Sequence, residues 1–390
     1  MQPAASDMSE TLPALEWAAL DRRVADMEVA EALLREAIAR DGGNTMLRRK
    51  LAGLLYDQSR LDEAIAVLEP ILVAGDSAAL RLRGEIARAA GDLDAAVQAL
   101  EQADETSGAL ALAVARRDGL DAGSPIARAV LETSPDDAQA LSVEARRLLA
   151  AGKAAEIDAL CATLEHRGAR GAEFFATWAS ARAALGDDAG VRWLIDYQSF
   201  LAVEDLHAPQ DLNAFNAELR GEILGHCNIV RPHATRATLG GLRIDDLRTV
   251  GTLMVARLVE KIREAVDVYA ARTPRGAHNP LGRHPGGAVT LTIWALLLDA
   301  EAHEQWHIHP SGLVSGVYYV EVPEGLEGDA GALELGLLPL GMPDSPPGWR
   351  RIVRPRAGAL VLFPSSYAHR TIATGREGSR ISIAFDVVRA

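Results

Sequence analysis

A pair of small and aliphatic residues recurs at a fixed interval in the first half of the chain, and such a repeat leaves few folds open. Ala32-Leu33, Ala64-Ile65 and Ala96-Val97 are each 32 positions apart. Ile157 and Val191 lie 34 positions apart, whereas the stretch between residues 97 and 157 is out of register. Because the segment is also rich in Ala, Leu, Glu and Arg, the repeat predicts stacked helical hairpins, with small residues where antiparallel helices cross.

With these positions, residues 14–195 resemble tetratricopeptide repeats in a degenerate form. The resemblance implies an all-α helical-repeat solenoid, preceded by an N-terminal tail at residues 1–13. An Ala-rich helical bundle without a binding groove is the alternative that the composition leaves open. The pattern does not specify what such an array would bind, because a fold alone does not determine a ligand.

The composition changes near residue 195. Five of the 18 prolines and one of the 10 histidines precede that point. Two helices are predicted, over residues 212–224 and 252–271, followed by a loop rich in Gly and Pro at residues 273–287. Short runs with strand character then cover residues 288–292, 316–322, 359–363 and 380–385. Short β runs separated by turn residues predict an antiparallel sandwich or barrel in a second domain, residues 196–390.

The charge and the cysteines exclude several classes of protein. The chain has 40 basic and 54 acidic residues, hence a net charge of −14, which disfavours binding to a phosphate backbone. Cys161 and Cys227 are too few for a disulfide framework. The sequence shows neither a secretory signal nor a run of about 18 apolar residues, the length that spans a membrane. We expect a soluble cytoplasmic protein whose partners are neither nucleic acid nor membrane.

The stretch His307-Ile308-His309 can present two imidazoles to one metal ion, because residues i and i+2 of a strand project from the same face. A third ligand must come from elsewhere, and His369 lies just past the predicted strand at 359–363. Arg380 opens the last predicted strand, with Ser382 on the same face. A guanidinium at that position can hold a carboxylate through two parallel hydrogen bonds, and the serine hydroxyl can add a third.

In order along the chain, these residues resemble the iron(II)/2-oxoglutarate oxygenases. The matching motifs are His307-Ile308-His309-Pro310, Ser315-Gly316-Val317-Tyr318-Tyr319, Phe363-Pro364-Ser365, His369 and Arg380-Ile381-Ser382. The resemblance implies a double-stranded β-helix (jelly-roll) in which His307, His309 and His369 bind iron(II). It also implies that Arg380 and Ser382 hold the distal carboxylate of 2-oxoglutarate. Tyr319 has the parity to bond the same carboxylate, and Tyr318 would replace it if a bulge shifts the register.

One position departs from the usual pattern of that family. Most members bind iron with two histidines and one carboxylate, and His309 stands at the carboxylate position. Three neutral imidazoles would leave the site at a charge of +2, which favours binding of dianionic 2-oxoglutarate. Alternatively, His309 is not a ligand and a nearby carboxylate acts in its place. Glu304, Glu321 and Asp386 are the candidates, although none has the spacing of the histidine pair.

The family pattern implies the reaction as well. 2-Oxoglutarate and dioxygen are consumed, succinate and carbon dioxide are released, and a C–H bond of the substrate is hydroxylated. Joining a repeat array to this catalyst predicts a protein or peptide substrate brought by the repeats. A small metabolite is the alternative, because the array could instead mediate homodimerisation or tether another enzyme.

Three rival functions remain open from the sequence. His303-Glu304-Gln305-Trp306-His307 matches the H-E-x-x-H pattern of zinc metallopeptidases, which requires a helix. Cupin-type metal dioxygenases share the spacing of Gly358, Pro364 and His369, although the glutamate of their first motif is replaced by Leu313 and Val314. The third rival is a non-catalytic repeat scaffold with a decayed barrel.

A local basic cluster precedes the predicted strand at 359–363. It consists of Arg350, Arg351, Arg354 and Arg356. Such a cluster can serve only to keep a loop in water, or it can receive an acidic substrate or segment.

Overall fold

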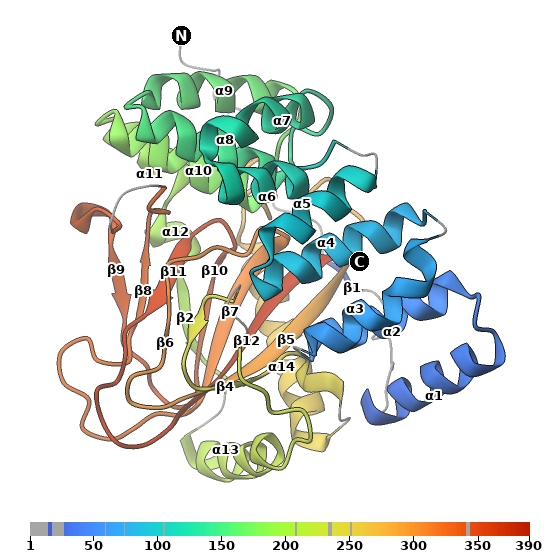
Figure 1. Ribbon diagram of the computed structural model, residues 1–390. Helices are drawn as coiled ribbons and strands as arrows, with labels where there is room; N and C mark the ends of the chain where they lie inside the picture. The colour runs from blue at the N-terminus through green and yellow to red at the C-terminus, as the bar shows by residue number, and fades with distance from the viewer. Residues whose placement is uncertain are drawn as a thin grey trace.

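The structure is a computed structural model, and it has two parts that lie against each other (Figure 1). It describes residues 15–17, 27–58, 60–73, 75–103, 106–206, 209–232, 236–249, 252–340 and 344–390. The predicted tail, residues 1–13, lies outside the described residues. The helices of the first half curve over the strands of the second half, whose own helices α13 and α14 lie on the far side.

The helical part confirms the predicted solenoid. Its helices follow one another with short connections, and each packs against the next along the chain. They are α1 (Met27–Arg40), α2 (Thr45–Asp57), α3 (Leu61–Leu72), α4 (Ser77–Ala90), α5 (Leu93–Gln102), α6 (Gly108–Asp118), α7 (Leu120–Thr133), α8 (Ala138–Ala150), α9 (Ala154–His166), α10 (Ala172–Ala184) and α11 (Asp188–Leu194).

The irregular register of the repeat has a physical cause. The helices α3, α5, α7, α9 and α11 begin at residues 61, 93, 120, 154 and 188, so the intervals are 32, 27, 34 and 34 residues. The short interval arises because only Gly119, with φ 101°, separates α6 from α7. The two helices touch closely, since a Cβ at Gly123 would lie 2.6 Å from the carbonyl oxygen of Ala111. The repeat formed by α5 and α6 is therefore shorter than the others, and the regular spacing of the repeats is interrupted there.

The predicted small residues lie at helix crossings in two of the three repeats. Ala64 and Ala96 are completely buried. The prediction is wrong for Ala32-Leu33, because Ala32 is exposed and 59 % of Leu33 is accessible to solvent. Helix α1 packs through Leu34 and Ile38 instead. As the first helix of the described array it has a neighbour on one side only, so the opposite face stays in water.

The second part confirms the predicted β architecture. Its main sheet has the order β1-β5-β12-β7-β10-β2, with β4 also paired to β5. These strands are β1 (Glu16–Trp17), β2 (Ala202–Asp205), β4 (Leu242–Ile244), β5 (Ala288–Leu298), β7 (Gly312–Glu321), β10 (Ala359–Pro364) and β12 (Arg380–Arg389). Strand β1 runs parallel to β5, and the other pairs are antiparallel.

A second layer of short strands faces the main sheet and closes the jelly-roll. Strands β11 (Ala368–Thr371), β8 (Leu333–Gly336) and β9 (Arg351–Val353) form one piece, and β3 (Thr238–Leu239) with β6 (His303–Glu304) forms another. A backbone bridge between His307 and His369 joins the two pieces. The remaining elements are α12 (Tyr197–Phe200), α13 (Pro209–Leu224), α14 (Leu253–Ala271) and the 3-10 turns η1 (Leu247–Thr249) and η2 (Pro347–Trp349).

The two faces of the main sheet have different neighbours. On β12, the side chains of Ile381, Ile383, Phe385 and Val387 pack into a core shared with α13 and α14. The alternate side chains of the same strand, Arg380, Ser382 and Ala384, line a cavity between the sheets. This alternation follows from the two-residue period of a strand. It places every chemically active side chain of β12 on the inner face.

The helical and β parts share one continuous core. Residues of α10 and of the β-strand half, such as Phe175 and Leu335, belong to a single cluster of buried apolar side chains. Across this contact, Ser180 Oγ donates to the carbonyl oxygen of Leu338 at 2.8 Å, and the backbone N–H of Asp196 donates to Tyr367 Oη at 2.8 Å. Within the described residues, no helix is both long and apolar enough to cross a bilayer.

Candidate metal and co-substrate site

Three histidines from distant points of the chain converge between the two sheets. His307 and His309 lie in the extended segment between β6 and β7, and His369 lies on β11. Their ligand nitrogens all lie within 4.8 Å of one another. The prediction that the first two stand on a regular strand is wrong in detail. Of the two, only His307 forms a β-bridge, through backbone hydrogen bonds of 2.9 and 3.0 Å with His369, whereas the N–H of His309 donates to the carbonyl oxygen of Ser365 at 3.3 Å. That bridge holds the segment extended and brings the third ring beside the first.

Hydrogen bonds orient all three imidazoles in the same way. Each Nδ1 faces an acceptor: the carbonyl oxygen of Gln305 at 2.7 Å for His307, that of Tyr367 at 3.0 Å for His369, and Asp386 Oδ1 at 2.6 Å for His309. An acceptor at Nδ1 fixes the proton on that atom and leaves the Nε2 lone pair free. The three Nε2 atoms are thus available to one cation.

The separation of the first two rings fits a shared metal ion. Nε2 of His307 lies 3.1 Å from Nε2 of His309. Two nitrogen ligands at right angles around an ion, each bonded at about 2.1 Å, lie about 3.0 Å apart. Two neutral acceptor atoms this close repel each other unless a cation lies between them. The donor set of three imidazole nitrogens suits iron as well as other first-row transition metals.

Asp386 is the carboxylate that most strongly affects the cluster. Besides His309, its Oδ1 accepts a hydrogen bond of 2.6 Å from Ser315 Oγ. Burial disfavours the charged form of His309, but the charge and hydrogen bond of Asp386 outweigh it, so the pKa of His309 is raised. Burial lowers the pKa of His369 well below its usual range, and the two neighbouring rings add to this effect. The carboxylate therefore contacts the outer nitrogen of an imidazole rather than the centre of the cluster.

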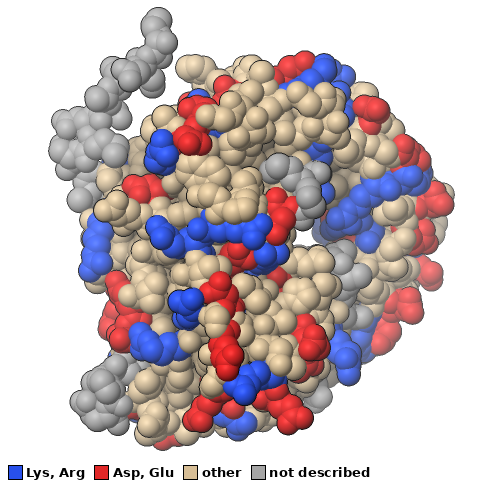
Figure 2. All heavy atoms as spheres, turned by 90° about the vertical axis from the view of Figure 1, so that its left-hand side faces the viewer, with Lys and Arg blue, Asp and Glu red and all other residues tan. Residues whose placement is uncertain are grey.

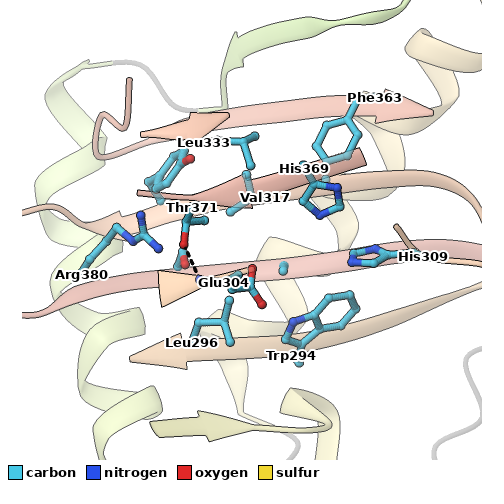
Figure 3. A pocket seen from close by; sticks show the side chains of 14 residues that line it. Trp294, Leu296, Glu304, His309, Val317, Leu333, Phe363, His369, Thr371 and Arg380 are labelled. Carbon is cyan, nitrogen blue, oxygen red and sulfur yellow. Dashed lines mark hydrogen bonds between the residues drawn. The ribbon is translucent and has the colours of Figure 1, made fainter. Parts of the chain in front are cut away.

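The other two carboxylates considered from the sequence have different positions. Glu321 pairs with Arg220 at the surface. Glu304 is buried, lines the same cavity as the histidines, and its Oε1 accepts a hydrogen bond of 3.2 Å from Thr238 Oγ1. Its backbone N–H donates to Thr371 Oγ1 at 2.8 Å, the dashed line in Figure 3. Among the described residues, neither carboxylate belongs to the group of side chains that could hold a metal.

A cavity between the two sheets runs from His309 and His369 to Arg380. Figure 3 shows His309 and His369 at one end, Arg380 at the other, and the apolar side chains of Leu296, Val317 and Leu333 between them. Only 1 % of Arg380 is exposed, and its Nη1 donates to the carbonyl oxygen of Gly331 at 2.6 Å. Its Nε has no hydrogen-bond partner within the described structure. A buried guanidinium with a spare donor is suited to a carboxylate that enters the cavity.

The two other residues predicted beside Arg380 also line this cavity. Ser382 and Tyr319 are buried there, and they face each other across β12 and β7. A register shift between Ile381 and Ser382 produces this pairing. Burial raises the pKa of Tyr319 to about 12, so the phenol stays a donor at neutral pH. Tyr318 points to the opposite face and donates to Asn216 Oδ1 at 2.7 Å, away from the cavity.

The family comparison was decisive for the chemistry. Residues 292–386 match a family model described as "Putative 2OG-Fe(II) oxygenase". That match identifies a 2OG-Fe(II) oxygenase domain in this part of the chain. Iron(II), 2-oxoglutarate and dioxygen are the metal, co-substrate and oxidant of that family, and the cavity offers three imidazoles and a buried guanidinium for them.

Each of the following similar solved structures covers about half of this chain. A prolyl-4-hydroxylase from Pseudomonas putida is 20 % identical, with 50 % of this chain and 94 % of that chain covered and a TM-score of 0.35. HygX from Streptomyces hygroscopicus, with nickel and 2-oxoglutarate bound, is 16 % identical, with 51 % and 87 % covered and a TM-score of 0.36. YrrB, a TPR protein with an unusual peptide-binding site, is 16 % identical, with 42 % and 89 % covered and a TM-score of 0.33. No curated protein matches the chain.

The structure of the oxygenase also bears on the zinc-peptidase alternative. His303 and Glu304 form strand β6, and the chain stays extended through His307. The H-E-x-x-H pattern brings its two histidines together only on a helix, where they are one turn apart. His303 is instead directed elsewhere, with its Nδ1 near the carbonyl oxygen of Glu301 at 3.0 Å.

The sequence indicated Asp386 only as a substitute ligand and indicated no role for Ser315. The hydroxyl of Ser315 forms hydrogen bonds with both Asp386 and Ser365. The signal for Asp386 was present in the two-residue period of β12. Arg380 and Ser382 were both placed on the inner face, so position 386 had to lie on that face too. What the period could not show is that this inner face ends beside His309.

Proposed function

We propose that this oxygenase hydroxylates a protein or peptide substrate, consuming 2-oxoglutarate and dioxygen and releasing succinate and carbon dioxide. In this proposal the helical repeats, residues 14–195, recruit the substrate and residues 196–390 carry the reaction. The observation that supports the catalytic part is the cavity that has His309 and His369 of the three-histidine cluster at one end and the buried guanidinium of Arg380 at the other. A co-substrate with a carboxylate at each end suits this cavity, because a metal ion on the histidines and the guanidinium of Arg380 would both be positively charged.

Each side chain then has a defined task. His307, His309 and His369 would bind iron(II) through Nε2, and Arg380 with Ser382 and Tyr319 would hold the distal carboxylate of 2-oxoglutarate. When bound, iron(II) with 2-oxoglutarate and dioxygen supplies the oxidising power for C–H hydroxylation. Leu296, Val317 and Leu333 line the cavity between the two ends and exclude water from it. Asp386 keeps the His309 ring turned with Nε2 inward.

The protein or peptide substrate is supported by the space outside the histidines. A second cavity of about 500 Å³ contains His307, His309 and Trp294, and a third of about 540 Å³ adjoins it through Thr292, Pro310, Ser311 and Asp386. The third cavity reaches Asp136 and Arg170 of the helical part. A groove that passes from the histidines to the repeats suits an extended chain better than a metabolite.

The catalytic proposal is tested without any substrate. Iron(II) and 2-oxoglutarate are added to the full-length protein under anaerobic conditions, and the visible charge-transfer band of the chelate is recorded. The wild type should develop the band, His307→Ala should not, and Arg380→Ala should require a much higher 2-oxoglutarate concentration. Arg376→Ala, which removes an exposed arginine, is the matched control and should behave as wild type. A wild type without the band would refute the oxygenase chemistry.

The substrate class needs a separate experiment. Succinate formation by the full-length protein is measured with a cell extract freed of small molecules, before and after protease treatment of the extract. Stimulation that disappears on proteolysis supports a protein substrate. Stimulation that resides in the small-molecule fraction would instead establish a metabolite substrate.

Location and assembly complete the proposal. Cys161 is buried and Cys227 is exposed, and both are free thiols, which favours a reducing, cytoplasmic compartment. A homodimer through the repeat array is the alternative use of that domain, and it is measured by light scattering of the full-length chain.

A further inference from the structure

We propose that a surface pocket between the repeats and the β-strand half binds an acidic segment of a partner polypeptide through Arg192 and Arg351. The pocket has a volume of about 910 Å³, and none of its lining residues lines the three cavities near the histidines. One wall comes from α11, α12 and the residues between them, and the other from η2 and the start of β9. The proposal does not depend on the oxygenase chemistry.

Unpaired positive charge marks this pocket. Three arginines of the basic cluster have carboxylate partners: Arg350 with Asp344 at 2.7 Å, Arg354 with Asp329 at 3.0 Å and Arg356 with Asp205 at 2.5 Å. Arg351 forms no ion pair within the described part of the chain, and the same holds for Arg192 on the opposite wall. Two guanidiniums without a carboxylate partner among the described residues thus line one pocket.

The carboxylate that the pocket itself contains cannot neutralise them. Asp196 accepts hydrogen bonds from the backbone N–H groups of Gln198 at 3.0 Å and Ser199 at 3.1 Å, and from Ser199 Oγ at 2.5 Å. It therefore caps the start of α12 and is already engaged. Asp196 forms no ion pair with Arg192 or Arg351 among the described residues, so an acidic partner could bind both guanidiniums.

Aromatic rings hold both guanidiniums in place. Arg192 lies over Trp349, with 6.0 Å between its guanidinium carbon and the ring centroid, and Arg351 lies over Tyr197 at 5.9 Å. Tyr197 Oη donates to the carbonyl oxygen of Trp349 at 3.0 Å, which fixes the two walls to each other. A guanidinium stacked on a ring keeps its N–H edge free for a carboxylate.

The distribution of charge favours a polypeptide over a single small anion. Figure 2 shows basic side chains gathered in a band across the middle of the face where α11 and β9 lie. Arg192 and Arg351 are both exposed and come from opposite walls, so each can bind a carboxylate of its own. Neighbouring Asp and Glu side chains of an acidic stretch supply such a pair. Exposed charge pairs of this kind weaken as salt rises.

Fluorescence anisotropy with a labelled oligo-glutamate peptide tests the site on the full-length protein at low salt. We expect binding of this peptide, no binding of a labelled oligo-lysine peptide, and weakening as NaCl is raised. The double variant Arg192→Glu/Arg351→Glu should lose affinity by about tenfold or more, because two attractive charges become repulsive. Arg354→Glu/Arg356→Glu is the matched control, with the same change in net charge, and should stay within about twofold of wild type.

Several outcomes would overturn the proposal. Equal losses in the two double variants would mean that the peptide senses only net charge. Full binding by Arg192→Glu/Arg351→Glu would place the peptide elsewhere. Displacement of the peptide by ATP or inorganic phosphate at lower concentrations than unlabelled oligo-glutamate would make this a phosphate site instead. Two controls accompany the binding assay. Unchanged circular dichroism melts in both double variants show that the fold is intact. An unchanged anaerobic iron(II)/2-oxoglutarate band shows that the separate cavity is intact.

Discussion

Asp386 Oδ1 lies 2.6 Å from Nδ1 of His309, so a carboxylate stands directly behind the histidine that occupies the family's usual carboxylate position. The negative charge of the usual ligand set is thus retained near the metal-binding cluster, one imidazole ring further out. Such a carboxylate–imidazole pair fixes the tautomer of the ring and raises its basicity as a ligand.

Replacing Asp386 with Asn should therefore weaken the site without dismantling it. We expect Asp386→Asn to lower iron(II) affinity by about 10- to 100-fold, the usual effect of removing a partner of a ligating histidine. Anaerobic titration of the charge-transfer band with iron(II) measures the change. Glu321→Gln removes a surface carboxylate and should leave the titration unchanged. Equal titrations for Asp386→Asn and wild type would rule out this role for the carboxylate.

The two adjacent tyrosines of β7 should separate co-substrate binding from stability. Tyr319 lines the cavity beside Ser382, so Tyr319→Phe should raise the 2-oxoglutarate concentration at half-saturation several-fold. Tyr318 bonds to Asn216 on the other face, so Tyr318→Phe should lower the free energy of unfolding by about 1 kcal/mol and leave 2-oxoglutarate binding intact. Band titrations and urea denaturation measure the two quantities. If Tyr318→Phe instead raised the 2-oxoglutarate concentration at half-saturation, Tyr318 rather than Tyr319 would have to face the co-substrate.

A buried glutamate makes the stability of the repeats depend on pH. Burial raises the pKa of Glu173 to about 7, from a usual value of 4.5, and Arg146 and Ser142 offset this only in part. Since the folded chain holds this proton more tightly than the unfolded chain, the contribution of Glu173 to stability is greatest below pH 4.5 and falls as the pH rises to 7. At pH 8, Glu173→Gln should increase the free energy of unfolding by about 1–3 kcal/mol, and near pH 4.5 by almost nothing.

Glu144 provides the matched comparison for that measurement. It is also buried, but Arg147 and Ser124 bind its carboxylate at 2.7 and 2.6 Å. Burial alone would raise its pKa, yet these partners outweigh burial and lower it. Glu144→Gln should therefore destabilise the chain at pH 8 by about 1–2 kcal/mol, with a smaller loss in acid. Urea denaturation at both pH values measures the free energy of unfolding of each variant. A change in the same direction for the two variants at pH 8 would contradict this account.

Two glycine substitutions should shift stability in opposite directions. A Cβ at Gly316 would collide with the ring of Phe385 and lie 2.8 Å from the carbonyl oxygen of Val361, so Gly316→Ala should cost about 1–3 kcal/mol. Gly221 lies in α13 with open space around its Cα, and Gly221→Ala should stabilise the chain by about 0.5–1 kcal/mol. Thermal melts followed by circular dichroism compare them. An unchanged melting temperature for Gly316→Ala would mean that the sheet shifts at this position to make room for the added Cβ.

Local patterns in the sequence predicted the elements and the inner face of the barrel. The alternation on β12 placed Arg380 and Ser382 together, and the spacing of His307 and His309 indicated a shared ion. The contact of His309 with Asp386 spans 77 residues and depends on how the strands are ordered, which no local pattern contains. Likewise, the exposure of Leu33 depends on which face of α1 meets a neighbour. Helical periodicity identifies an apolar face but not the partner that covers it.

Strand β1 has a practical consequence for anyone who cuts this chain in two. Glu16 and Trp17 pair with Ala288 and Val289 of β5, and Trp17 Nε1 donates to Asp267 Oδ1 at 2.9 Å. The helical array is thus anchored to the catalytic barrel at its leading end as well as at its trailing end. A fragment that starts at residue 196 would leave a sheet border bare and prone to pairing with other copies. The smallest well-behaved catalytic unit has to retain this anchoring dipeptide.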